Sequence, residues 1–430
     1  MATERLSHEH LPNRWIIAGA AVLMQVCLGA NYAWSVFVKP LTASEPWTLT
    51  QVSAAFTIAM ACLGIGSAIG GRWQVRRGPQ VVGTTAGLLY GGGFLIGALA
   101  VSHHSLWLLY GGYGVLGGLG MGMGYICPVP PITKWFPDKR GLMTGAAVMG
   151  FGGGALIVSP IAARLIQAHG VPATLLSFGI AYVILIPLVV RLFKDPPPGW
   201  RPEGWQPVTA VAKAATRIDY TPSEAVKTWR FWLLWLLLSL NSSAGIMIIS
   251  QASPLAQQQA GLSAVAAGTI VGIIAIFNAA GRMFWAWLSD SLGRAQVFFI
   301  LFAVQVGLFF SLPSLHGALP FTVAVCAIAL CYGGGYGILP SMTADFFGSK
   351  HVGGILGCVL LGWGFAAAVP SPLLIAYIRQ TTGTYEYAIY TIGFVMLFSL
   401  IFPVLARREA IRIAAHEEAQ RASASVQSAA

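Results

Sequence analysis

The sequence predicts an all-α, polytopic membrane protein with twelve transmembrane helices in two pseudo-symmetric bundles of six. Three observations support this fold class. Of the 430 residues, 56% are hydrophobic and only 9% are charged, with a mean hydropathy of +0.71, which is not typical of a soluble domain. Twelve apolar segments are each long enough to cross a bilayer, which takes about 20 residues. Features of the first half also recur in the second.

Six apolar segments precede a linker rich in proline and charge, and six follow it. Residues 1–193 are thus expected to form the N-terminal bundle and residues 230–406 the C-terminal bundle. A cytoplasmic linker at 194–229, with a short surface helix near TPSEAVK, would join them, and 407–430 would form a cytoplasmic tail. The expected spans are 15–37, 51–71, 79–101, 106–132, 141–163, 172–193, 230–253, 263–288, 295–315, 320–342, 353–378 and 386–406.

Positive charge is distributed unevenly over this topology. If the N-terminus is cytoplasmic, all but four of the 25 Lys and Arg residues lie in cytoplasmic segments, as the positive-inside rule predicts. The exceptions are Lys39, Arg164 and Arg379 on the other side and Arg282 within a span. Both termini are therefore expected in the cytoplasm. We also expect the protein to be a monomer in the inner membrane of a bacterium. Topology alone accounts for the net charge of +11, so no nucleic acid partner is expected.

Small residues and cysteines both indicate helix packing rather than chemistry. The 51 glycines would let helices approach closely in lipid, where no hydrophobic force presses them together. The run GLGMGMG resembles a nucleotide-binding loop only in its letters, because no strand precedes it. All six cysteines fall within expected spans, without spacing typical of a metal site. We therefore expect no metal, no cofactor and no enzymatic activity.

An internal repeat relates the two halves. Tyr125 precedes Trp135 and Phe136 by ten residues, and Tyr336 precedes Phe346 and Phe347 by the same ten. The two copies are offset by about half the chain. Repeated halves with a binding site between them near the midplane are typical of secondary transporters, because rocking of one bundle against the other alternates access to the site.

Three motifs resemble a known family. The run GRMFWAWLSDSLGR resembles the signature loop of the major facilitator superfamily, and KWFPDKRGLMTG and ADFFGSKHVGG resemble its oxalate/formate antiporter and monocarboxylate transporter branch. The resemblance spans essentially the whole chain and implies the twelve-helix, two-bundle fold and a small organic anion as substrate. The first-half loop departs from the signature, with Val75 where an acid is expected. The second-half loop keeps Asp290, so the resemblance implies a gating charge latch formed by Asp290 and Arg294.

Arg282 lies inside an apolar segment, where burial at a helix centre costs roughly 2.5–3.5 kcal/mol on insertion scales. In one interpretation it only reaches the membrane edge or pairs with Asp290, eight residues on and about 12 Å along the helix. In the other, its planar guanidinium binds a carboxylate in a central cavity. The resemblance implies the second, because an arginine at this position is a substrate ligand in the oxalate/formate branch. Asn278, four residues earlier, shares the same helix face and could orient the anion.

Two departures from the family bear on the substrate. The oxalate antiporter carries a lysine in its eleventh helix where this chain has Trp363, so a single buried cation remains. One cation neutralises one carboxylate, which favours a monocarboxylate such as lactate, pyruvate or acetate. Vertebrate-type monocarboxylate transporters also carry a proton-accepting acid four residues before the arginine, where this chain has Asn278. None of the 14 acids falls in the core of an expected span, the nearest being Glu386.

Symport of H⁺ with the monocarboxylate is the favoured mechanism, with the proton carried by the substrate itself. An inside-negative potential opposes entry of a lone anion by about 2.3 kcal/mol per charge per 100 mV. The alternative is an organic anion exchanger of the oxalate/formate type, which needs no proton carrier. A non-transporting membrane receptor is less favoured, because the linker and tail are too short for a large signalling domain.

Aromatic residues would complete the site. The resemblance places four tyrosines at aromatic positions that line the anion site, although each is also compatible with an ordinary packing role. Lys39 matches a first-helix lysine of the monocarboxylate branch and would attract anions from outside, or simply extend to the membrane surface. Leu28 would contact a short substrate chain. The expected lining tyrosines are Tyr32, Tyr125, Tyr332 and Tyr336.

Overall fold

The computed structural model describes residues 13–138, 140–197, 200–202, 219–348, 351–368, 372–413 and 415, and this part of the chain is helical with no strand. Residues 1–12, most of the linker (203–218) and the end of the tail lie outside the described residues. The helices of the first half are α1 (Arg14–Gly29), the 3₁₀ segment η1 (Ala30–Trp34), α2 (Ser35–Ser44), α3 (Leu49–Ser102), α4 (Leu106–Leu109), the π-helical η2 (Tyr110–Gly117), α5 (Gly118–Ile126), α6 (Val129–Trp135) and α7 (Arg140–Val190).

The second half begins with a short helix in the linker, where TPSEAVK predicts one. Its N-terminus is capped by Thr221 and Glu224 in a capping box, which satisfies backbone N–H groups that lack a helical partner. The helices are α8 (Pro222–Ala225), α9 (Trp229–Gln259), α10 (Ala264–Leu292), α11 (Arg294–Ser311), the 3₁₀ segment η3 (Leu312–Ser314), α12 (Ala318–Phe347), α13 (Val352–Val359), α14 (Leu361–Ala368), α15 (Pro372–Thr382), α16 (Glu386–Ser399) and a helical stretch at 401–413.

Ten segments of the described chain are long and apolar enough to cross a membrane by length and composition, and two features reconcile this number with the twelve expected spans. The fifth and sixth spans are two helices that share the label α7 and meet at Gly170, whose φ of +79° and ψ of 174° are not helical, so they count as one segment. The described part of the expected eleventh span, 353–378, carries α13, α14 and α15; residues 369–371 lie outside the described residues, so no described helix of this span reaches spanning length. The second and third spans meet in the same way at Gly78 of α3, with φ of +78°. Glycine tolerates this left-handed conformation, in which L-residues with a Cβ are strained.

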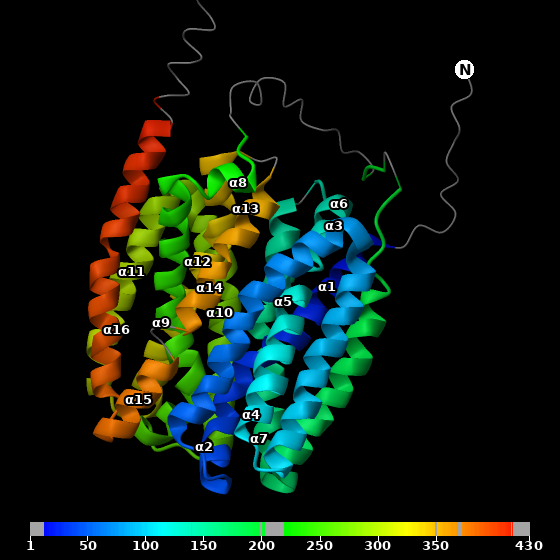
Figure 1. The fold of residues 1–430 in the computed structure, drawn as a ribbon. Helices are drawn as coiled ribbons and strands as arrows, with labels where there is room; N and C mark the ends of the chain where they lie inside the picture. Colours follow the sequence, from blue (N-terminus) through cyan, green and yellow to red (C-terminus); the bar gives the residue numbers. More distant parts are fainter. Residues whose placement is uncertain are drawn as a thin grey trace, which may run out of the picture.

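The helices form two bundles side by side. Figure 1 shows α1 to α7 in one group and α9 to α16 in the other. The start of α1, helices α6 and α8 and the end of the 401–413 helix lie at one face, called the terminal face below, and α2 and α15 lie at the other, called the opposite face. This arrangement is the predicted fold class.

The two bundles approach each other closely at small residues. Helix α7 packs against α10, and α14 packs against α3. A Cβ added at Gly152 of α7 would lie 3.3 Å from the backbone of Ala279 on α10, and one at Gly364 of α14 would lie 2.9 Å from the carbonyl oxygen of Ala61. Such close backbone approach maximises van der Waals contact where lipid supplies no hydrophobic force.

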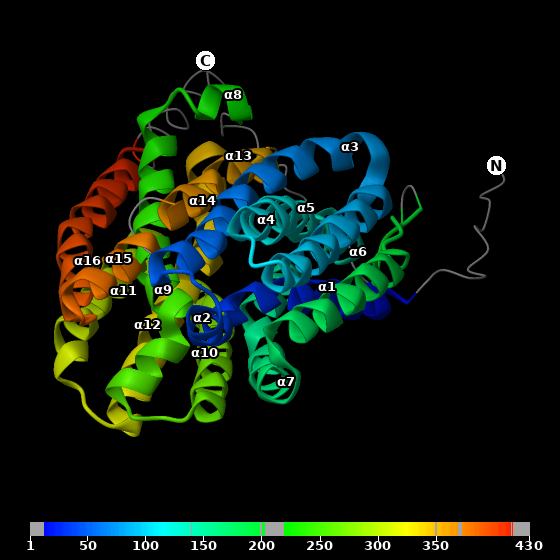
Figure 2. The same ribbon diagram turned by 60° about the horizontal axis from the view of Figure 1, so that its bottom comes forward.

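At the opposite face, neutral hydrogen bonds join the two bundles. Thr50 donates its hydroxyl to the Gln380 side chain at 2.8 Å, and Gln251 donates its amide to the Ser53 hydroxyl at 2.9 Å. In Figure 2, where the opposite face is turned forward, α2 lies beside α9. The bundles are therefore in direct contact at this face.

Two glycines on α12 determine how closely α10 can approach. A Cβ at Gly333 would overlap the carbonyl oxygen of Asn278, and one at Gly337 would overlap that of Arg282. The i, i+4 spacing of these glycines gives α12 a flat strip against which α10 packs, as in the small-xxx-small pattern of membrane helices.

We predict that Gly333→Ala destabilises the protein, because overpacking of this kind costs about 1–3 kcal/mol. A shift of the thermal unfolding midpoint in detergent measures the effect. The matched control is Gly307→Ala on α11, where an added Cβ meets nothing within 4 Å. Equal midpoints for the two variants would contradict the close packing of α10 on α12.

Candidate substrate site around Arg282

Helix α10 carries Arg282 and Asn278 into the middle of the protein between α7 and α12. The helix begins at Ser263, whose hydroxyl accepts from the backbone N–H of Ala266, and its face toward α7 and α12 is the buried one. Arg282 is only 2% exposed and Asn278 is fully buried. Because they are one turn apart, both side chains start from the same helix face.

The guanidinium of Arg282 is only partly satisfied. Its Nη1 donates to the carbonyl oxygen of Val148 on α7 at 3.1 Å, and its Cζ lies 5.1 Å from the centre of the Tyr336 ring, within the range of a cation–π contact. Its Nε and Nη2 have no hydrogen-bond partner. Within the described chain no carboxylate pairs with Arg282, so the interpretation in which it pairs with Asp290 or reaches the membrane edge is wrong.

Asn278 is similarly unpartnered. Neither its side-chain oxygen nor its side-chain nitrogen makes a hydrogen bond, although an amide buried without partners costs roughly 1–3 kcal/mol. Two neighbouring polar groups on one helix turn thus both keep free hydrogen-bonding capacity. This combination is rare in a packed interior and is typical of a binding site.

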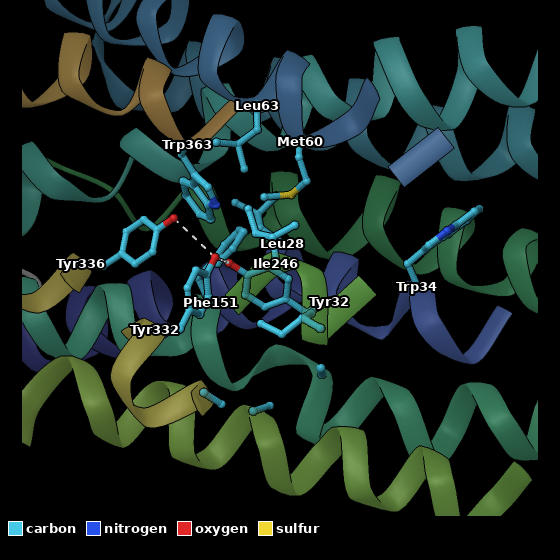
Figure 3. Packing of buried hydrophobic residues seen from close by; sticks show 14 of the residues in the cluster. Leu28, Tyr32, Trp34, Met60, Leu63, Phe151, Ile246, Tyr332, Tyr336 and Trp363 are labelled. Carbon is cyan, nitrogen blue, oxygen red and sulfur yellow. Dashed lines mark hydrogen bonds between the residues drawn. The ribbon is translucent and has the colours of Figure 1, made fainter. Parts of the chain in front are cut away.

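An aromatic cluster surrounds the guanidinium. Tyr32 of η1 and Tyr332 of α12 share a hydrogen bond between their hydroxyls at 2.7 Å, which crosses from one bundle to the other. Trp363 of α14 packs on Tyr336 and on Tyr125 with ring centres 4.8 and 5.3 Å apart. Figure 3 shows Tyr32, Tyr332, Tyr336 and Trp363 converging on one point, with Leu28 in the same group.

The structure therefore brings most of the expected site residues together. Arg282, Asn278, Tyr332, Tyr336, Tyr125, Tyr32, Trp363 and Leu28 belong to one buried region. Lys39 is separate. It lies on α2 at the opposite face and donates to the Gln257 side chain of the other bundle at 3.0 Å.

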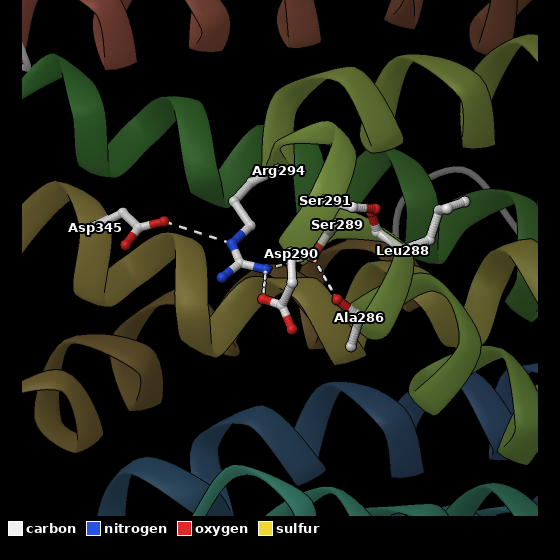
Figure 4. A network of polar contacts seen from close by, with 7 residues as sticks. All are labelled: Ala286, Leu288, Ser289, Asp290, Ser291, Arg294 and Asp345. Carbon is white, nitrogen blue, oxygen red and sulfur yellow. Dashed lines mark hydrogen bonds and ion pairs between the residues drawn. The ribbon is translucent and has the colours of Figure 1, made fainter.

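Asp290 and Arg294 form an ion pair, as the charge latch requires. The Nη1 of Arg294 also donates to the hydroxyl of Ser289 at 2.6 Å, and its Nε lies 3.5 Å from a carboxylate oxygen of Asp345 (Figure 4). These residues come from α10, α11 and α12, so this network ties together the end of one bundle rather than bridging the two.

Sequence reasoning missed several members of the site. Phe151 of α7 lies 5.2 Å from the Tyr32 ring and 5.5 Å from Trp363, and nothing in its sequence surroundings distinguishes it. Ser242 of α9 pairs with the Tyr336 hydroxyl at 2.7 Å. The polar run NSS inside an apolar span was a usable signal for it. Asp345 of the latch was also missed, although it stands in the ADFFG motif.

Comparison with known proteins shows the family of the chain. The family model described as Major Facilitator Superfamily matches residues 21–343. The chain is similar to the oxalate:formate antiporter of Oxalobacter formigenes, 30% identical over 79% of each chain. It is also similar to monocarboxylate transporter 12 of Mus musculus, 25% identical over 90% of this chain and 84% of that one.

A solved structure shows the same fold. The D-xylose-proton symporter superposes with a TM-score of 0.71 at 14% identity, covering 90% of this chain and 97% of that one. Since the family consists of transporters, the prediction that the chain is not an enzyme is confirmed. The chain belongs to the major facilitator superfamily, in the branch that includes oxalate/formate antiporters and monocarboxylate transporters, and is a multi-pass membrane transporter.

Proposed function

We propose that the protein transports small monocarboxylates by alternating access, with the substrate carboxylate bound by Arg282. One observation carries the proposal: a fully enclosed guanidinium keeps two nitrogens unpartnered, and no carboxylate of the described chain neutralises it. A substrate anion would supply the missing acceptor oxygens. Charge-assisted hydrogen bonds of this kind are about twice as strong as neutral ones.

The Asn278 amide and the tyrosine hydroxyls give the site its polar lining. The Asn278 nitrogen could donate to the carboxylate, and the hydroxyls of Tyr32 and Tyr332 could exchange their mutual hydrogen bond for one to the substrate. Because that mutual bond links the two bundles, substrate binding would act on the contact between them. This supports coupling of substrate occupancy to bundle movement.

A single charge at the site favours a monocarboxylate. Trp363 is fully buried against Tyr336 and Tyr125, at the position where the resemblance to the oxalate/formate branch implies a lysine. The relatives named above act, by their names, on oxalate and formate or on monocarboxylates. With Arg282 as the one central cation, a dianion would keep an uncompensated charge in a low-dielectric interior.

We propose proton symport as the coupling mode, with lactate, pyruvate and acetate as candidate substrates. Charge balance supports it, because uptake of an anion with a proton is not opposed by an inside-negative potential. Anion exchange is the second candidate. It is favoured by the lack of any carboxylate of the described chain beside Arg282 that could serve as a proton carrier. The terminal face, which carries most of the positive charge, would be cytoplasmic in the inner membrane of a bacterium.

We predict that Arg282→Gln abolishes uptake and that Arg282→Lys reduces it at least tenfold, because lysine lacks the planar fork. A charged hydrogen bond worth about 1.5–3 kcal/mol corresponds to roughly a 10- to 150-fold change in affinity. The measurement is uptake of radiolabelled lactate, pyruvate and acetate into proteoliposomes. Arg408→Gln, which removes an exposed cation of the terminal face, is the control. Near-normal uptake by Arg282→Gln would remove the proposed site.

A second experiment distinguishes symport from exchange. We expect uptake into empty liposomes to follow an imposed inward proton gradient and to collapse when the gradient is dissipated. Liposomes preloaded with the same acid provide the comparison. A strict requirement for trapped internal anion, with no response to pH, would establish exchange instead.

If the number of cations at the site sets the number of carboxylates on the substrate, a second cation should change the selectivity. Trp363→Lys places a second cation beside the aromatic cluster and should shift preference from monocarboxylates toward oxalate. The ratio of oxalate to lactate uptake measures the shift, with Trp363→Phe as a neutral aromatic control. An unchanged ratio would contradict the argument that one cation selects one carboxylate.

A further inference from the structure

A small cavity lies beside Asn278 and shares Tyr32 with the aromatic cluster. Its wall includes Asn278 and Ala275 of α10, Ala155 of α7, Ala252 and Ile249 of α9, and Tyr32 of η1. Both bundles therefore contribute to it. The surface that these residues present to the cavity is apolar, and the remaining space holds about one sphere of water size.

The position of the cavity follows from the pairing of α7 with α10. Arg282 contacts Val148, and its Nε lies 3.2 Å from the Cβ position of Gly152. One turn further along both helices, toward the opposite face, Ala155 and Asn278 share the cavity wall. Asn278 thus borders the cavity, whereas Arg282 is not among the residues that line it.

The size and polarity of the cavity limit what can occupy it. A space lined by apolar groups does not hold water well, because water needs two to four polar partners. One water-sized sphere is also about the size of one methyl group. A carboxylate, by contrast, would lose its hydration there without gaining partners.

We propose that this cavity is the tail subsite of the transporter and admits the terminal methyl group of a short carboxylate of two or three carbons. The inference rests on the proposed function, since it requires the carboxylate to bind at Arg282 and Asn278. The substrate class is then acetate, propionate, pyruvate or lactate, rather than formate, which has no tail, or oxalate, whose second carboxylate would be buried in apolar surroundings. Alanine at positions 155, 252 and 275 keeps the space open.

Filling and enlarging the cavity should change selectivity in opposite directions. Burial of one methylene or methyl group is worth about fourfold in affinity. Ala275→Val fills the space, so affinity for propionate should fall about fourfold while affinity for formate changes less than twofold. Ile274→Ala, which removes a larger side chain from the wall, should raise the affinity for butyrate relative to propionate about fourfold or more.

The test uses the purified full-length protein in detergent, with formate, propionate and butyrate as probes. Each acid is titrated, and the rise of the thermal unfolding midpoint gives an apparent dissociation constant. Ala280→Val is the control, because Ala280 lies on the same helix but is exposed. Arg282→Gln is measured in parallel and should lose the response to all three acids.

The outcomes separate the two proposals. Unchanged propionate-to-formate ratios in folded Ala275→Val, or an unchanged butyrate-to-propionate ratio in Ile274→Ala, would overturn the tail subsite and leave the carboxylate site standing. If Ala275→Val fails to fold, the Ile274→Ala ratio alone decides. Binding of the acids that persists unaltered in Arg282→Gln, or no binding by the unaltered protein, would overturn the proposed function and the subsite with it.

Discussion

The interior of this protein surrounds the guanidinium of Arg282, whose N–H groups find only some of the hydrogen-bond acceptors they need within the protein. Within the described chain, Arg282 donates a hydrogen bond to the Val148 carbonyl, rests against the Tyr336 ring and lies close to Tyr125. A charge in low-dielectric surroundings is unfavourable unless paired, and here the pairing group is absent from the described chain. The aromatic cluster excludes lipid and shapes the space, but it cannot neutralise the charge. A ligand that brings an anionic oxygen removes that penalty only while it is bound, which is suited to repeated binding and release.

Close helix packing positions the guanidinium and its neighbours. Gly333 and Gly337 let α12 touch the backbone of α10 at Asn278 and Arg282, and Gly152 lets α7 approach the same turn from the other bundle. The site is therefore held between helices of both bundles. The contacts that cross between bundles at the opposite face include neutral hydrogen bonds, such as Thr50 with Gln380, and one from the Lys39 ammonium to Gln257. A neutral bond of this kind contributes about 0.5–1.5 kcal/mol, so it could break and reform in the proposed alternating-access cycle.

The charged residues around Arg294 at the terminal face hold helices of one bundle together, unlike Arg282 at the centre. Arg294 is shared by Asp290, Asp345 and Ser289, all within one bundle. Such a network strengthens the ends of α10, α11 and α12 as one unit. A rigid bundle end is useful in a rocking mechanism, because movement of α10 is then transmitted to the neighbouring helices rather than absorbed by a loop.

The sequence by itself determined the membrane class, the twelve crossings and the buried arginine, because apolar length and an isolated charge are local properties that need no partner to be recognised. Gly78 and Gly170, where α3 and α7 leave helical geometry, both lie between expected spans. Only the tertiary structure decided the rest. Phe151, Ser242 and Asp345 join their sites from other helices, and the turn at Leu360 between α13 and α14 is not visible in the composition of the eleventh span. Whether Arg282 meets Asp290, eight residues away, or a carbonyl 134 residues away depends on how α10 packs between α7 and α12. That packing depends on contacts between residues that are far apart in the sequence, and local sequence patterns do not reveal such contacts.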